Sequence, residues 1–182
     1  MDDYKETLRE QIKEACARAL YTYEAQNVRA SKLKTKARYL KIAQIVTSAL
    51  SAAGITVALT EILMCDKEIL LIATTLVSFI SLALDLYCKE FQMASEVLLL
   101  CRTSNELWII REEYYSLLTD FDEINVTEIK KKRDEIADKL KEIYKNAPRT
   151  DNEDYEEACN RLKHGEQTFT NEEIQKIMPY YL

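Results

Sequence analysis

Two carboxylates of this chain lie at the ends of long apolar stretches, where an ionised side chain is costly if the stretch is in a membrane. Glu61 follows a run without any charged residue over 42–60, and Asp85 follows a second such run over 69–84. Rings of carboxylates at the mouths of a membrane pore attract cations. The chemistry that these positions suggest is therefore electrostatic attraction of a cation.

Small and polar residues mark one face of each run, at steps of three and four positions. Such residues gather where membrane helices touch, because backbones approach closely and hydroxyls can pair. They would also suit a water-filled path, although one helix pair cannot enclose a channel and several copies would be needed. Helix packing and pore lining both stay open. The candidate seam residues are Gln44, Thr47, Ser51, Gly54, Ala58, Glu61, Thr74, Ser78, Ser81 and Asp85.

Both runs have a length that suits a membrane-spanning helix. The hydrocarbon core of a bilayer takes about 20 helical residues to cross, and we predict spans over about 42–64 and 69–88. The link between them, 65–68, is so short that the two helices must be antiparallel neighbours. The alternative is a buried hydrophobic helix pair in a soluble protein.

The flanking charges favour the membrane hairpin and orient it. No acidic residue occurs over 25–60, whereas six bases precede or open the first run. Because cytoplasmic flanks of spanning helices collect Lys and Arg, we expect both termini in the cytoplasm and the link outside. The membrane-flanking bases are Arg29, Lys32, Lys34, Lys36, Arg38 and Lys41.

The rest of the chain is predicted to be helical, because it contains few residues that break helices. Two Gly and two Pro occur in 182 residues. We expect an all-α chain with an amphipathic, basic helix over 1–41, a transmembrane hairpin over 42–88 and a cytoplasmic helical region over 89–182. The long terminal helices should form a bundle, with further helices over about 127–146 and 152–163. Trp108, Tyr114 and Tyr115 are predicted core residues.

The sequence contains no catalytic or metal-binding constellation. Its five Cys are scattered without a CxxC pair, and one His cannot complete a familiar zinc site. No nucleophile elbow or Gly-rich phosphate loop occurs, and a net charge of −6 does not suit a phosphate backbone. We therefore expect reduced thiols, no enzymatic activity, no cofactor, no metal and no direct nucleic-acid binding.

Three segments resemble the bacterial SLATT proteins. They are KLKTKARYLKIAQIVTSAL at 32–50, LWIIREEYYSLLTD at 107–120 and DYEEACNRLKHGEQTFTNEEIQKIMPYYL at 154–182. The resemblance implies a two-span effector of bacterial conflict or anti-phage systems, which oligomerises in the inner membrane and opens a pore or breaches it. It also implies a co-encoded nucleotide synthase, nucleotide sensor or reverse transcriptase as partner, beside membrane lipids and further copies of the chain. A non-conducting membrane anchor that recruits a partner complex is the alternative.

Overall fold

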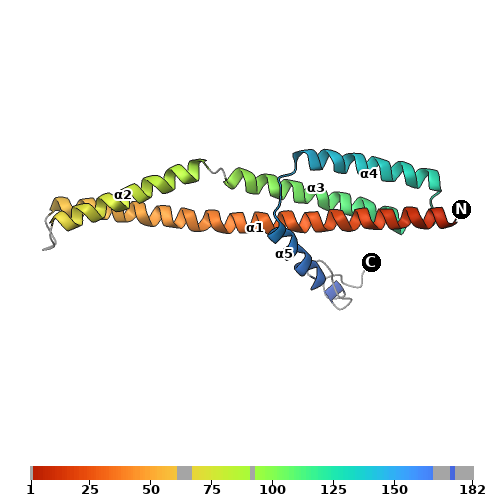
Figure 1. Cartoon of the computed structure of the whole chain (residues 1–182), viewed down its shortest axis with the longest axis horizontal. Coiled ribbons are helices and arrows are strands. Elements are labelled where there is room, and N and C mark those ends of the chain that lie inside the picture. The colour runs from red at the N-terminus through yellow and green to blue at the C-terminus, as the bar shows by residue number, and fades with distance from the viewer. Residues whose placement is uncertain (1, 61–66, 91–92, 166–172, 175–182) are drawn as a thin grey trace. The chain divides into compact units, whose positions relative to one another are not determined.

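The computed structural model of the chain describes residues 2–60, 67–90, 93–165 and 173–174. All the elements in these ranges are α-helices, so the predicted all-α class is confirmed for the described residues. The helices are shown in Figure 1: α1 (Asp2–Thr60), α2 (Lys67–Glu90), α3 (Met93–Thr119), α4 (Val126–Asn146) and α5 (Asn152–Lys163).

The first helix, α1, runs without interruption from the charged N-terminal part of the sequence into the first apolar run. No Pro occurs within it, and Gly54 is its sole Gly. The predicted N-terminal helix and the helix of the first apolar run are therefore one continuous helix. Residues of α1 belong to both compact units of the chain, unit 1 (Met1–Ala30 and Leu98–Leu182) and unit 2 (Ser31–Val97).

Unit 1 has its core where α1, α3 and α4 pack together. The apolar residues of α4 recur at helical spacing and turn Ile129 and Ile136 inward, with 0% and 5% of their surface exposed. These side chains meet Leu8 and Ile12 of α1 and Leu117 of α3. The N-terminal part of α1 and the C-terminal region thus share one apolar core.

The buried face of α3 differs from the predicted one at an aromatic residue. Tyr114 is 2% exposed and belongs to the core, but Tyr115 is 58% exposed. Trp108 is half-buried and packs against Tyr23 of α1, with ring centroids 5.1 Å apart. The prediction of a core position is therefore wrong for Tyr115, because the helix turns the adjacent Tyr114 inward.

The last two helices begin and end at sequence signals that act locally. The Asn125 side chain accepts a hydrogen bond of 2.9 Å from the Glu128 amide and caps α4, which ends two positions before Pro148. Asp151 caps α5 and forms a capping box with Asp154. Gly165 follows α5 at a φ of 79°, a left-handed conformation that glycine adopts without strain.

Candidate functional site

In unit 2, the seam of small and polar residues lies between α1 and α2. The Gln44 side-chain amide donates to the Asp85 carboxylate, and the hydroxyl oxygens of Ser48 and Ser81 are 3.1 Å apart. The residue numbers of the contacts increase along α1 and decrease along α2, so the two helices are antiparallel. Polar groups of one helix are thus satisfied by the other, which matters most where water is absent.

Gly54 lies where α1 comes closest to Thr74 of α2. A β-carbon at Gly54 would overlap Cγ2 of Thr74 and lie 3.3 Å from its Cβ. Any side chain here would push the helices apart or turn Thr74, so the close approach requires glycine.

Other hydroxyls of the predicted seam form hydrogen bonds within their own helix or have no described partner. Thr47 donates its hydroxyl to the Ala43 carbonyl at 3.0 Å, and Ser78 donates to the Thr74 carbonyl at 2.8 Å. The Ser51 hydroxyl oxygen is buried and has no hydrogen-bond partner among the described residues. Ala58 belongs to α1, but its side chain, like the whole of Glu61, lies outside the described residues.

One contact residue was missed by the sequence pattern. Ser48 directly follows Thr47, and steps of three and four positions fit either residue equally well. Its contact with Ser81, which is 9% exposed, is what identifies it. Only the pairing of the helices decides between two neighbouring hydroxyls.

The outer surface of this helix pair is apolar. Phe79 is 67% exposed and Leu76 is 59% exposed, although the Ser81 side chain on the same helix is buried. Soluble proteins keep contiguous exposed apolar surface small, whereas lipid tails accommodate it. The other large exposed apolar side chains of the two predicted spans are Ile42, Ile45, Val46, Leu50, Ile69, Ile72, Ile80, Leu82 and Leu86.

One stretch among the described residues, Ile72–Thr119, includes a segment apolar enough to cross a membrane. Its most apolar window has a mean hydropathy of 1.4, and none of that window is buried within the chain. The side chains of the first run are described only as far as Gly54. The predicted second span over 69–88 thus overlaps this stretch, and part of the predicted first span lies outside the described residues.

The basic segment before the first run separates into two parts. The Arg29 guanidinium lies 3.5 Å from Asp154 and 3.4 Å from Asp151, and its side chain is 27% exposed. Arg29 therefore belongs with the carboxylates of α5 in unit 1. The remaining predicted flanking bases, all of them exposed, are Lys32, Lys34, Lys36, Arg38 and Lys41.

A cluster of buried charges holds α5 on α1 in unit 1. Glu24 is 3% exposed and lies 3.5 Å from the Arg161 guanidinium, and Asp154, 1% exposed, is paired with Arg29. Each helix thus contributes one carboxylate and one arginine. The buried apolar cluster beneath them is small and consists of Ala25, Val28 and Ala158, and the rings of Tyr21 and Tyr155 lie with centroids 6.0 Å apart. Removing one partner of such a pair leaves an uncompensated buried charge, so the cluster fixes how α5 docks.

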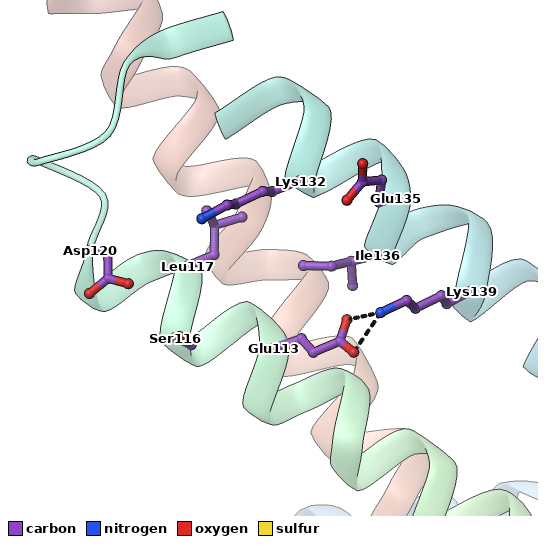
Figure 2. A pocket seen from close by; sticks show the side chains of 8 residues that line it. All are labelled: Glu113, Ser116, Leu117, Asp120, Lys132, Glu135, Ile136 and Lys139. Carbon is purple, nitrogen blue, oxygen red and sulfur yellow. Dashed lines mark hydrogen bonds and ion pairs between the residues drawn. The ribbon is translucent and has the colours of Figure 1, made fainter. Parts of the chain in front are cut away.

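A pocket of about 230 Å³ opens between α3 and α4 (Figure 2). Lys139 reaches across it and contacts both carboxylate oxygens of Glu113, at 2.7 and 2.9 Å. Leu117 and Ile136 form its apolar wall. The other lining base, Lys132, lies 3.9 Å from Glu128. Because both lining bases are paired with acids, the pocket resembles an ordinary groove between two helices.

The described residues that could bind a metal or react as thiols are the acids, the His and the Cys side chains. The described residues contain no group of three or more His, Cys, Asp or Glu side chains that could hold a metal ion. Cys16 donates to the Arg111 carbonyl at 3.8 Å, and burial raises the pKa of its thiol. A raised pKa keeps this thiol protonated and weakly nucleophilic. Cys16, Cys88, Cys101 and Cys159 are all free thiols.

Comparison with known proteins gives one family. Among curated proteins and among solved structures, no match to the chain is significant. The model of SMODS and SLOG-associating 2TM effector domain family 4 matches residues 8–173. The match includes both apolar runs, the antiparallel helix pair and all five helices, at least in part. The chain therefore belongs to the SMODS and SLOG-associating 2TM effector (SLATT) family, as the resemblance of its three segments predicted.

Proposed function

We propose that this chain is an oligomeric effector of the bacterial inner membrane, which permeabilises the membrane when the polar seam between α1 and α2 opens. The main observation behind this proposal is that unit 2 exposes large apolar side chains and pairs polar ones between its helices. Large apolar side chains such as Phe79 face outward, and polar ones such as Ser48 and Ser81 face each other. This arrangement suits a helix pair surrounded by lipid, with both termini in the cytoplasm and residues 65–68 outside.

The seam has two states in this proposal. In the closed state, Gln44 bonds Asp85 and Ser48 bonds Ser81, so these four polar side chains are paired within one chain. In the open state, the helices separate and several copies turn their seams toward a shared, water-filled centre. Asp85 and Glu61 would then place carboxylates near opposite mouths, which favours cations.

The trigger would act through the cytoplasmic helices of unit 1. In this proposal, 1–41 and 89–182 serve as the sensing part and 42–88 as the membrane part. A co-encoded nucleotide synthase, nucleotide sensor or reverse transcriptase supplies the signal in an anti-phage system, and the infected cell is halted. Support for this assignment comes from membership of an effector family associated with SMODS and SLOG.

A disulfide across the seam tests the opening step. In a chain whose native Cys are replaced by Ser, Ser48→Cys with Ser81→Cys places two thiols where the hydroxyl oxygens are 3.1 Å apart, close enough for a disulfide. We expect the oxidised chain to stop potassium efflux from cells that overproduce it, and dithiothreitol to restore efflux. Ala49→Cys with Leu82→Cys is the matched control, since both positions are exposed.

The efflux measurement distinguishes a membrane pore from a non-conducting membrane anchor. Unchanged efflux from the oxidised double variant would show that the seam does not need to open. Intact membranes under every condition would instead favour the alternative, a non-conducting anchor that recruits a partner complex. That alternative draws on the same contacts, because hydroxyl and amide pairs that are satisfied within one chain also serve simple helix packing.

A further inference from the structure

A groove of about 240 Å³ lies in unit 2, where the basic part of α1 gives way to the apolar run. One face of α1 forms one side of it, with Ala37, Leu40, Lys41 and Gln44 at helical spacing. Cys88 of α2 and Met93 of α3 line the other side. Most of its wall is therefore apolar, with a single cationic side chain.

The cationic side chain, Lys41, has no ion pair in the part of the chain that the structure describes. The same is true of Lys34, which precedes Lys41 by two helical turns on the same side of α1. The Asp85 carboxylate accepts a hydrogen bond from Gln44 and forms no ion pair with Lys41. Elsewhere many bases are neutralised within the chain, as Arg29 is by Asp154 and Lys139 by Glu113. Among the described residues, the groove thus combines apolar walls with a lysine that forms no ion pair.

This combination matches one ligand class. We propose that the groove binds a phospholipid with an anionic headgroup, whose acyl chain lies against Leu40, Cys88 and Met93 and whose phosphate contacts Lys41. The inference rests on the proposed membrane insertion of unit 2. In that setting the groove lies at the depth of the lipid phosphates, because the bases end and the uncharged run begins there. A bound lipid would join α1, α2 and α3 at the point where they leave the bilayer.

Native mass spectrometry of the full chain in detergent tests the proposal, with phosphatidylglycerol and phosphatidylcholine added in turn. We expect one phosphatidylglycerol per chain to be retained, and Lys41→Gln to weaken its retention by about tenfold, the effect of losing one charge-assisted contact. Ala37→Phe should fill the groove and remove the lipid altogether. Arg38→Gln and Ala43→Phe are the matched controls, because both positions are exposed and neither lines the groove.

Cys88 provides a second readout that does not depend on activity. In a chain with Cys88 as its only cysteine, phosphatidylglycerol should slow maleimide labelling of Cys88, and phosphatidylcholine should not. Equal effects of the two lipids would show occupation by any acyl chain and would overturn the anionic site, even with insertion and efflux intact. Lys41→Gln without effect on retention would overturn it too. Recovery of the chain from the aqueous phase without detergent would overturn both this site and the proposed function.

Discussion

At the scale of single residues, Gly54 and Thr74 set how closely α1 and α2 approach. The absent side chain of Gly54 leaves the space that Cγ2 of Thr74 occupies. Around this point Gln44 with Asp85 and Ser48 with Ser81 hold the helices together by hydrogen bonds. Close approach and polar contact therefore support each other, a combination that is common in membrane helix pairs.

Gly54→Ala should destabilise this helix pair although alanine is the better helix former. Alanine gains about 1 kcal/mol in helix propensity, but overpacking costs about 1–3 kcal/mol. We expect a lower melting temperature in detergent. Thr74→Ser removes the overlapping Cγ2 and keeps the hydroxyl, so it should restore the stability of the Gly54→Ala chain. Ala53→Leu, at an exposed position, is the control. A melting temperature unchanged by Gly54→Ala would contradict the close approach.

Cys16 should react slowly with alkylating reagents at neutral pH. Burial raises the pKa of its thiol, so the thiolate fraction at a given pH is smaller than for an ordinary thiol. In a chain with Cys16 as the only cysteine, the iodoacetamide rate should still increase at a pH where the same chain, unfolded in urea, has reached its plateau. Coinciding pH profiles for the folded and unfolded chains would show that burial does not control this thiol.

At the scale of helices, α5 docks through charge more than through apolar area. The buried apolar side chains of its contact with α1 are small, Ala25, Val28 and Ala158, and the one ring contact described between the two helices, Tyr21 with Tyr155, includes a half-exposed ring. The buried carboxylates of Glu24 and Asp154 are compensated by arginines of the opposite helix. Such an interface is specific in geometry but gains little from the hydrophobic effect, so a single lost charge should loosen it.

Asp154→Ala should release α5 from α1 while the rest of unit 1 stays folded. The substitution removes a capping-box acceptor and leaves Arg29 without its buried partner. Hydrogen bonds to charged groups contribute about 1.5–3 kcal/mol, so hydrogen exchange in α5 should become about tenfold faster or more. Glu156→Ala, at an exposed position of the same helix, is the matched control. Equal exchange in the two variants would show that the charge pair does not hold α5.

At the scale of the whole molecule, the two units differ in which side chains they expose and which they bury. In unit 2 the exposed apolar side chains follow both runs, and the polar side chains of the seam face the neighbouring helix. In unit 1 many apolar side chains are buried in a core that includes Tyr114 and Phe121. One chain thus combines a helix pair suited to lipid with a helical bundle suited to water.

Phe79→Lys should reduce membrane insertion, and Ile109→Lys should not. Both residues are large, apolar and exposed, at 67% and 57%, but Phe79 belongs to unit 2 and Ile109 to unit 1. A lysine near the middle of a spanning helix costs about 2.5–3.5 kcal/mol on insertion scales. Carbonate extraction of bacterial membranes measures the outcome. Equal membrane fractions for the two variants would contradict the assignment of the two surfaces.

The sequence by itself determined where the helices lie, because the signals that begin and end them act over a few residues. Asn125 and Asp151 cap helices, Pro148 follows the end of one, and Gly165 adopts the φ that ends another. The apolar runs were also clear from the sequence, since uncharged stretches of this length can be identified without knowing what they contact. Family membership also followed from segments along the chain.

The tertiary structure alone decided which face each helix turns toward its neighbours. Tyr114 and Tyr115 are adjacent and similar, and α3 carries apolar residues on more than one side, so periodicity could not choose between them. The same holds for Thr47 and Ser48, and for Arg29, whose partners lie more than a hundred positions away in the sequence. Contacts between distant residues fix these choices, because each side chain is placed by the surface that packs against it.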